Sequence, residues 1–516
     1  MNEFDPKMKE KRQKSTKKVM LYDATLREGT QAEGVSLSST DKIKITKLLD
    51  ELGVHYIEGG WPGSNPKDVE FFKRVKDIKL KKARIAAFGS TCHKDTKPEI
   101  DPNIKALLDS ETPVVTIFGK TWVLHVKDAL HATLNKNLEM IEKSVKYLKS
   151  KKREVIFDAE HFFDGYKDNS EYALKTLRAA SNGGADALVL CDTNGGSLPH
   201  EIMDITGTVV KEFPDVTIGI HTHNDSGSAM SNTLAAIQAG ATHTQGTING
   251  YGERCGNADL STLIPNLQLK MGFDVLPPKN LVHLTRVANA VAFIANQPPP
   301  YRSPYIGRSA FAHKGGIHVS AMRRNSLTYQ HIDPKLVGNE SRVLVSELAG
   351  KSNLYDKLEK MGVKGETIDL KEVLKKIKTL EHEGFSFEGA EASVELLLLR
   401  CKKDYKPPFK MLDFTVVVEH REKRGIFAEA TVKLLIEGET FHMAAEGDGP
   451  VDALHAALAK ALREKHPNID KFHLADYKVH IIDSDKGTGA ITRVIICLLY
   501  TSPSPRDRTR SRMPSS

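Results

Sequence analysis

Residues 217–240, TIGIHTHNDSGSAMSNTLAAIQAG, contain one complete strand–helix unit. The unit opens with a β-rich apolar run, Thr217–His223, and continues through a polar loop. A segment with helical periodicity then covers Ser228–Ala239, and it is followed by Gly240, a residue that commonly ends helices. The stretch therefore predicts a strand, a loop and a helix in that order, which is the repeating unit of α/β folds.

The same unit recurs throughout the first 250 residues. Eight β-rich apolar runs are found there: Val19–Leu26, Tyr56–Trp61, Ala83–Phe88, Val114–Phe118, Glu154–Ala159, Ala187–Cys191, Thr217–His223 and His243–Asn249. Helix-like segments lie between them, among them Thr40–Leu52, Asn137–Lys149, Glu171–Ala180 and His200–Phe213. Eight such units in about 250 residues are typical of a (β/α)8 barrel. A doubly wound open sheet would need a glycine-rich loop after its first strand, where TLREGTQ stands instead.

The rest of the chain predicts two further parts. We expect an α/β TIM barrel over residues 19–274, a helical linker subdomain over 275–400 and a small α+β domain over 411–496, with KKDYKPPFK (402–410) as a linker. The small domain is predicted from an amphipathic helix, Val451–Lys465, and four strand-like runs: Phe414–Glu419, Ala428–Ile436, Tyr477–Ile482 and Ile491–Ile496. We expect this domain to lack its last elements.

The net charge of +8 lies in two tails. Residues 1–18 carry seven Lys or Arg against three Asp or Glu, and residues 501–516 carry four Arg against one Asp. We expect 1–18 to be disordered and 497–516, which turns to Ser, Pro and Arg, to be disordered or not authentic. Because the excess charge is absent from the predicted domains, nucleic-acid binding is not expected.

Composition points to a cytoplasmic protein. No window approaches about 18 consecutive apolar residues, so neither a membrane span nor a membrane partner is expected. The basic N-terminus lacks the apolar stretch of a secretory signal. Five cysteines without a C-x-x-C pair indicate neither a disulfide framework nor a zinc ribbon.

His221 and His223 are the strongest local signal of chemistry. Side chains of a strand alternate between faces, so both imidazoles point the same way and can share one metal ion. Glu28, at the end of the first predicted strand, could complete a mixed nitrogen and oxygen site suited to Mn, Mg or Zn. Its neighbour Arg27 could hold a 2-oxo acid carboxylate or stabilise an enolate oxygen. A chance H-x-H pair and a surface salt bridge are the alternative interpretations.

Three ordered motifs, LREGTQ (26–31), HTHND (221–225) and GYGERCGN (250–257), resemble those of the 2-isopropylmalate, homocitrate and citramalate synthases. The resemblance covers about residues 19–496. Two segments, YIEGGWPGSNPKD (56–68) and FEGAEAS (387–393), look like the citramalate synthase branch. The segment GDGPVDALHAAL (447–458) looks like the end-product regulatory domain of the family.

The resemblance implies a set of site residues. It makes Glu28, His221 and His223 metal ligands, with Asn257 as a further ligand or near neighbour. Many relatives have Asp where this chain has Glu28, whereas homocitrate synthases have Glu. The catalytic residues that it implies are Arg27, Glu160 and His318, and the residues that contact the oxo acid are Arg27 and Thr193.

The resemblance also implies a reaction. Acetyl-CoA would condense with a 2-oxo acid in a metal-dependent acyl transfer, with His318 and Glu160 as the pair that removes a methyl proton. Pyruvate is the favoured oxo acid, which would place the chain in isoleucine biosynthesis, with isoleucine as a feedback effector. Lys120 or His125 could instead serve the second carboxylate of 2-oxoglutarate.

Other classes stay open at this point. A homocitrate or 2-isopropylmalate synthase would use another oxo acid, and an acyl-CoA lyase would break the bond instead of making it. A non-catalytic amino-acid sensor built on the C-terminal domain would require the barrel to be catalytically inactive. The family resemblance also implies a homodimer.

Overall fold

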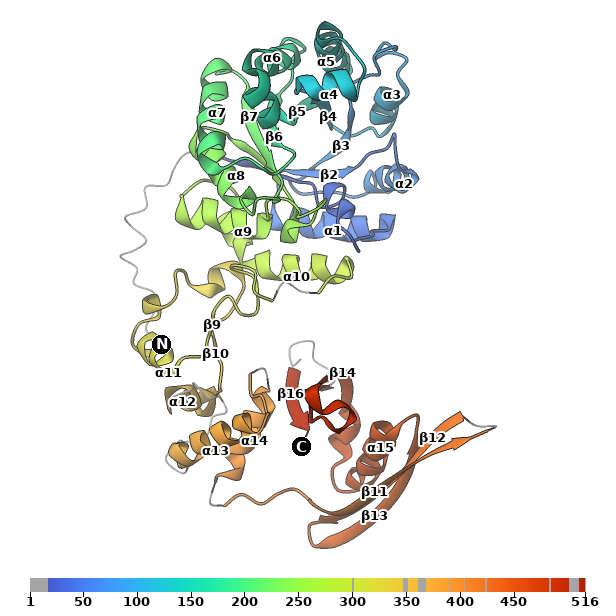
Figure 1. Ribbon diagram of the computed structural model, residues 1–516, viewed down its shortest axis with the longest axis vertical. Coiled ribbons are helices and arrows are strands. Elements are labelled where there is room, and N and C mark those ends of the chain that lie inside the picture. Colours follow the sequence, from blue (N-terminus) through green and yellow to red (C-terminus); the bar gives the residue numbers. More distant parts are fainter. Residues whose placement is uncertain are drawn as a thin grey trace. The chain divides into compact units, whose positions relative to one another are not determined.

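The computed structural model describes residues 17–298, 301–346, 351–360, 368–388, 390–402, 404–422, 425–481, 484–500 and 510–515. The chain divides into two compact units (Figure 1). We call residues 3–311 with 331–341 the barrel unit, and residues 312–330 with 342–516 the C-terminal unit. The barrel unit thus includes part of the stretch after residue 274. The sequence-based boundary between barrel and linker stays a prediction.

Eight parallel strands form a closed barrel in the order of the sequence, which confirms the predicted fold class. They are β1 (Met20–Asp23), β2 (Tyr56–Gly60), β3 (Arg84–Ser90), β4 (Val114–Lys120), β5 (Glu154–Glu160), β6 (Ala187–Asp192), β7 (Thr217–Thr222) and β8 (His243–Gly246). β8 closes the barrel on β1, with Met20 opposite His243 and Asp23 opposite Gly246.

Helices cover the outside of the strands (Figure 1). They are α1 (Ser39–Leu52), α2 (Pro66–Val75), α3 (Pro102–Asp109), α4 (Val123–Asp128), α5 (Leu134–Ser150), α6 (Phe162–Asn182), α7 (Pro199–Glu212) and α8 (Ala229–Gln238). Their ends follow local sequence rules. Ser38 and Asp41 form a capping box before α1, and Gly53 ends that helix in the left-handed conformation at φ 97°.

Two apolar layers hold the barrel together. Most of the buried core lies between the strands and the surrounding helices, as expected for parallel strands covered by helices. A smaller cluster fills the inside of the barrel, where the rings of Tyr22, Tyr56 and His243 lie 5.5–5.9 Å apart. Gly219 is required beside them, because a Cβ there would stand 2.9 Å from the His243 ring.

The barrel unit continues past β8 into short helices. They are α9 (Leu260–Pro265), a π-helical turn (Asn266–Lys270) and α10 (Leu284–Ile294). Residues 331–341 return to this unit, where the Asn339 side chain donates to the backbone oxygens of Tyr305 and Gly307 at 2.8 and 3.0 Å. Across the described residues, no helix is long and apolar enough to cross a membrane.

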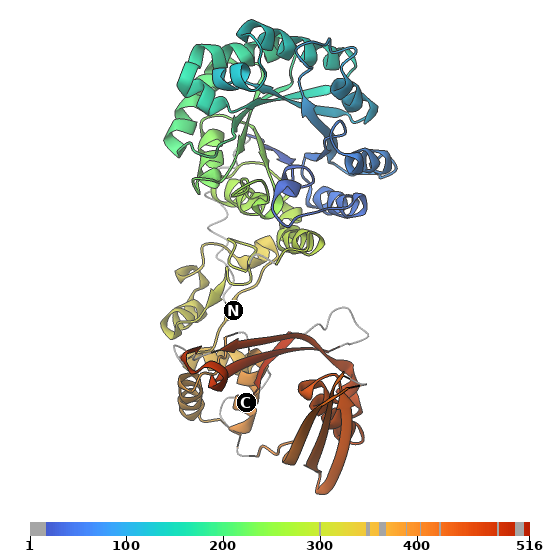
Figure 2. The ribbon, with the colours of Figure 1, turned by 45° about the vertical axis from the view of Figure 1, so that its right-hand side comes forward.

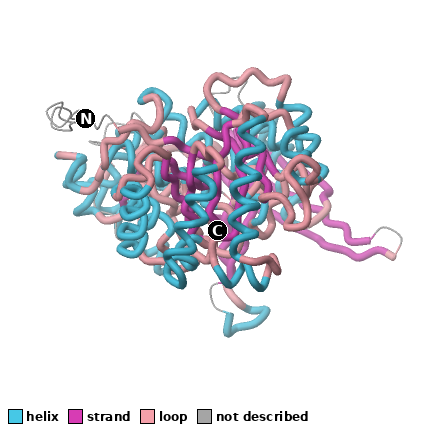
Figure 3. Tube along the Cα trace, turned by 90° about the horizontal axis from the view of Figure 1, so that it is seen from above, coloured by secondary structure: helices cyan, strands magenta, loops and turns pink. Residues whose placement is uncertain are grey.

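The C-terminal unit begins with helices and ends with sheets. Its first elements are β9 (Ala312–His313), α11 (Gly316–Arg324), β10 (Arg342–Val343), α12 (Lys351–Lys360), α13 (Leu370–His382) and α14 (Glu391–Arg400). A three-stranded antiparallel sheet follows, made of β11 (Lys410–Arg421), β12 (Gly425–Ile436) and β13 (Glu439–Gly447). Figure 3 shows β11 and β12 continuing as a long two-stranded ribbon.

One face of that sheet is covered by α15 (Pro450–Arg463) (Figure 2). Alternate residues of β12, from Ala428 to Ile436, are buried with Ala453, Ala457 and Ala461 of the helix. The sequence predicted this helix and two of the three strands but missed β13, whose residues alternate between half-buried and exposed.

A second antiparallel sheet contains β14 (Phe472–Ile481), β15 (Thr492–Tyr500) and β16 (Arg510–Ser515). β15 extends beyond the predicted strand end at Ile496 to Tyr500, and β16 covers residues 510–515, so two strands fall within the stretch for which an irregular tail is predicted. The predicted N-terminal tail lies outside the described residues except for 17 and 18. Whether the C-terminal tail is authentic stays a prediction.

Candidate active site and metal centre

The four metal-ligand candidates predicted from the sequence lie at the carboxyl ends of the barrel strands. Glu28 opens a short 3-10 helix, Glu28–Gln31, just after β1. His221 lies in β7 and His223 follows that strand. Asn257 follows β8 and forms an isolated β-bridge with His223. Because all of them follow strands at the same end of the barrel, residues far apart in sequence meet there.

Glu28, His221 and His223 are close enough to bind one metal ion. One ligand atom from each lies within 4.8 Å of the others, and all three residues are buried. The Nε2 atoms of the two histidines are 3.3 Å apart, and Nε2 of His223 is 3.7 Å from Glu28 Oε1. Nδ2 of Asn257 lies 3.1 Å from His221 Nε2, while its buried Oδ1 has no hydrogen-bond partner within the described part of the chain. Two imidazoles and a carboxylate fit a divalent cation, and the Asn257 amide lies beside them.

The electrostatics favour the protonation states that metal ligands need. Burial lowers the pKa of His223 to about 3, with a further contribution from His221, so this imidazole is neutral near pH 7. Burial alone would raise the pKa of Glu28, but Arg27, His221 and His223 outweigh it and lower that pKa. A neutral imidazole and an ionised carboxylate are the forms that bind cations.

Arg27 is fixed by three contacts. Its guanidinium forms ion pairs with Glu28 and Glu58, the latter through Nε at 2.6 Å from Glu58 Oε1. Its Cζ lies 3.7 Å from the centre of the Phe88 ring. Glu58 is fully buried in β2 and also accepts from the Tyr22 hydroxyl at 2.6 Å. Although burial alone would lower the pKa of Arg27, the two carboxylates outweigh it and raise that pKa. Arg27 is therefore a permanent, rigid cation beside the metal ligands.

The Phe88 ring that stacks on Arg27 belongs to an aromatic group. The rings of Trp61, Phe88 and Phe118 lie 5.5–5.8 Å apart from one another. Trp61 is held by its indole Nε1, which donates to Asn103 at 2.8 Å. This group gives the site an apolar side next to a cation.

Glu160 and Thr193 lie at the same end of the barrel, at the ends of β5 and β6. Glu160 pairs with Lys120, its partner residue in the β4–β5 register. The Thr193 hydroxyl accepts from the backbone N–H of His161 at 2.9 Å. The Thr193 backbone oxygen accepts from Arg254 at 2.7 Å, and Arg254 also pairs with Asp225. These bonds tie together the loops that follow β6, β7 and β8.

His318 is not part of this cluster within the barrel unit. It lies in α11 of the C-terminal unit, where its ring stacks on Tyr329 with centroids 4.1 Å apart. The roles of Glu160, Thr193 and His318 stay predictions.

Sequence reasoning missed three buried polar residues inside the barrel. The amide oxygen of Gln245 in β8 accepts a hydrogen bond from His221 Nδ1 at 2.8 Å, and the amide nitrogen of Gln245 donates to Asp158 Oδ1 at 2.9 Å. Burial and the nearby Glu58 raise the pKa of Asp158 well above its usual value. Glu58, Asp158 and Gln245 are all buried polar residues in barrel strands.

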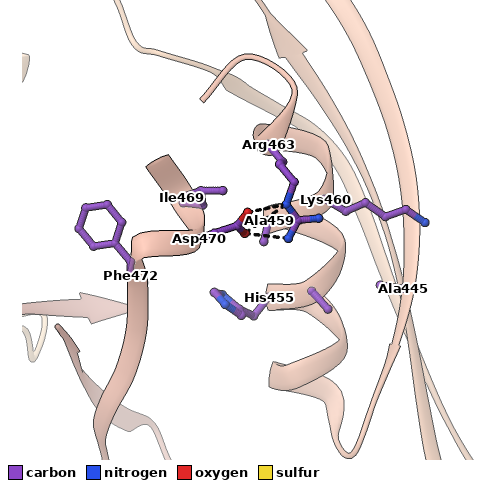
Figure 4. A pocket seen from close by; sticks show the side chains of 9 residues that line it. Ala445, His455, Ala459, Lys460, Arg463, Ile469, Asp470 and Phe472 are labelled. Carbon is purple, nitrogen blue, oxygen red and sulfur yellow. Dashed lines mark hydrogen bonds and ion pairs between the residues drawn. The ribbon is translucent and has the colours of Figure 1, made fainter. Parts of the chain in front are cut away.

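A separate cavity of about 450 Å³ lies in the C-terminal unit (Figure 4). It is bounded by α15, the end of β13 and the segment Pro467–Lys471. Arg463 donates two hydrogen bonds to Asp470 at 2.8 Å beside it, and His455 and Lys460 also line it. A concave site with both charge signs could hold a small zwitterion.

Three known families match successive parts of the chain. The HMGL-like family matches residues 18–291, the homocitrate synthase post-HMGL domain-like family matches 305–384, and the LeuA allosteric (dimerisation) domain matches 388–502. These matches cover the barrel, the helices that follow it and the two C-terminal sheets except β16.

Sequence identities to individual proteins show which members of these families the chain resembles most strongly among those compared. The chain is 54% identical to the (R)-citramalate synthase of Aquifex aeolicus and 50% identical to that of Geobacter sulfurreducens, in each case over 93% of this chain and 91% of the relative. It is 34% identical to the 2-isopropylmalate synthase of Sulfolobus acidocaldarius, over 75% of this chain. With its barrel, its metal-ligand geometry and these identities over nearly its whole length, the chain belongs to the (R)-citramalate synthase family of HMGL-like enzymes.

Proposed function

We propose that the chain condenses acetyl-CoA with pyruvate and water to give citramalate and free CoA. The observation that carries this proposal is the cluster of Glu28, His221 and His223 beside the fixed cation Arg27. The relatives' name supports the identity of the product. Because the thioester is hydrolysed, the overall synthesis is effectively irreversible.

Each group then has a defined task. Glu28, His221, His223 and the Asn257 amide oxygen would hold a divalent metal ion, Mn, Mg or Zn, which supplies Lewis-acid polarisation of the oxo-acid carbonyl when bound. The Arg27 guanidinium holds a substrate oxygen and stabilises the charge that develops on it. The Thr193 side chain orients the oxo acid.

The proton of the acetyl methyl group needs a base. We assign its removal to Glu160 and His318, the two residues that the family resemblance implies for general acid–base work. The resulting carbon nucleophile forms the new C–C bond at the ketone carbon of pyruvate. Water then cleaves the thioester, and the sulfur leaves as the CoA thiol.

The surroundings of Arg27 favour pyruvate over 2-oxoglutarate. A second carboxylate would need an unpaired cation, because burying it alone is costly. Lys120 and His125 were the two candidates from the sequence for that task, and the Lys120 ammonium is already paired with Glu160. The Trp61, Phe88 and Phe118 rings suit the single methyl group of pyruvate instead.

The test is release of CoA thiol from acetyl-CoA with Mn²⁺, compared across pyruvate, 2-oxoisovalerate and 2-oxoglutarate. We expect at least tenfold higher kcat/KM with pyruvate, and no turnover by His221→Ala. Preference for either other oxo acid would move the enzyme to the 2-isopropylmalate or homocitrate branch. An inactive, metal-loaded wild type would instead favour a sensor without catalysis.

We further propose that the enzyme works in the cytoplasm as a homodimer and that isoleucine inhibits it. The match of residues 388–502 to an allosteric, dimerising domain supports this assignment, and the Figure 4 cavity is a suitable size for an amino acid. Inhibition that is lost in Arg463→Ala, with uninhibited activity kept, would support it. Unchanged activity at millimolar isoleucine would contradict it.

A further inference from the structure

A line of buried polar groups runs from the metal ligands into the barrel. His221 Nδ1 lies 2.8 Å from Gln245 Oε1, and Gln245 Nε2 donates to Asp158 Oδ1 at 2.9 Å. The exposed fraction is 5% for His221, 0% for Gln245 and 4% for Asp158, so water does not compete for these bonds. All three residues lie in strands, β7, β8 and β5, which are rigid elements of the barrel.

The directions of these bonds decide where the His221 proton lies. Gln245 uses its N–H group on Asp158, so the atom that faces His221 is a carbonyl oxygen. A carbonyl oxygen only accepts, and therefore Nδ1 of His221 must carry the proton. Nε2 then carries the lone pair on the side of His223, Glu28 and Asn257, as a metal ligand must.

We propose that Gln245 is a positioning residue for the metal site: its carbonyl oxygen fixes His221 in the Nδ1-protonated tautomer and in the ring orientation that binds the cation. Asp158 accepts the hydrogen bond from Gln245 Nε2 and so keeps the Gln245 amide oxygen directed toward His221. This inference rests on the proposed metal site but not on the proposed substrates. Groups that orient a metal-binding histidine in this way typically change metal affinity by about 10- to 100-fold.

Two substitutions of Gln245 distinguish a positioning role from a purely space-filling role, because the two roles predict opposite orders of Mn²⁺ affinity. Gln245→Met keeps the size of the side chain but removes the acceptor, so we expect Mn²⁺ to bind about 10- to 100-fold more weakly. Gln245→Glu keeps an acceptor toward His221, and Asp158, whose raised pKa favours its protonated form, can donate to the new carboxylate. We expect this variant to bind Mn²⁺ within threefold of the wild type.

If Gln245 only filled space, the order would be reversed. The apolar, similar-sized Met would be tolerated, and the buried charge of Glu would be the damaging change. The proposal is therefore overturned if Gln245→Met binds Mn²⁺ within threefold of the wild type, or if Gln245→Glu loses as much affinity as Gln245→Met.

The measurement is calorimetric titration of the metal-stripped full-length protein with Mn²⁺, without substrates, together with the unfolding temperature of each metal-free variant. His55→Leu is the matched control, because it removes another buried hydrogen bond, from Leu21 N to His55 Nδ1, away from the ligands. We expect it to lower the unfolding temperature without changing Mn²⁺ affinity. His221→Ala tests whether the metal site exists, because unchanged Mn²⁺ binding by this variant would refute the site itself. The Gln245 variants test only the positioning role of Gln245.

Discussion

Arg254 Nε lies 2.7 Å from Asp225 Oδ1, and this ion pair joins the loop after β8 to the loop after β7. The same guanidinium reaches the backbone oxygen of Thr193 after β6. One side chain thus ties together three loops that carry Thr193, His223 and Asn257.

Arg254→Met should therefore loosen the oxo-acid site while leaving the barrel intact. The ion pair is partly exposed, so its loss should cost at most about 1 kcal/mol, or about a fivefold rise in the KM for pyruvate. Steady-state kinetics check this prediction. Arg178→Met, which breaks a surface pair with Glu212, is the control and should leave KM unchanged.

Arg27→Lys should lower kcat far more than it lowers stability. Lysine cannot pair with Glu28 and Glu58 at once or stack on Phe88 as a planar guanidinium does. Losing a group that stabilises developing charge typically costs about 100- to 1,000-fold in kcat. Turnover measured at saturating substrates tests this, and activity near that of the wild type would remove Arg27 from the mechanism.

Mn²⁺ should raise the unfolding temperature of the wild type but not that of Glu28→Gln. A ligand that binds only the folded state at 100 times its Kd stabilises it by about 2.7 kcal/mol. Removing the carboxylate charge takes away one of the three clustered ligands. Thermal unfolding with and without Mn²⁺ gives the answer, and an equal shift in both proteins would place the metal elsewhere.

Phe118→Ala should broaden the range of oxo acids. Its ring stacks on Phe88 and meets Trp61 edge-on, so its loss opens apolar space beside Arg27. Each additional methylene accommodated in an apolar pocket changes discrimination by roughly 10- to 200-fold. We expect the preference for pyruvate over 2-oxobutyrate to fall by at least tenfold, as measured by the ratio of kcat/KM values. An unchanged ratio would place the methyl group of pyruvate elsewhere.

His243 should make the fold sensitive to acid. Burial lowers its pKa to about 3, against about 6.5 in an unfolded chain. Its contribution to stability is thus fully present above pH 6.5 and is lost as the pH falls, by about 2 kcal/mol between pH 8 and pH 5. His243→Leu should flatten this dependence in denaturant titrations at the two pH values, whatever its effect at pH 8. An identical slope in both proteins would contradict the assignment.

The barrel and the paired histidines of the candidate metal site were accessible from sequence because each rests on a local pattern. Apolar runs mark the strands, and the alternation of His221 and His223 places both imidazoles on one face. Glu58, Asp158 and Gln245 were not accessible in this way, since a polar residue in a strand does not reveal which partner it will meet across the barrel. The pairing of Lys120 with Glu160 depends on the β4–β5 register, so the sequence left Lys120 open as a substrate ligand.

The pairing of β1 with β8 sets the time at which the site can form during synthesis. Residues 20–23 leave the ribosome early but find their second partner only when residues 243–246 have been made. Glu28 lies on one side of this seam and Asn257 on the other, so the proposed four-residue cation site needs every residue up to Asn257. Contacts between such distant segments form late in folding. Binding of the metal ion would therefore follow completion of the barrel, and it would link the loop after the first strand to the loop after the last.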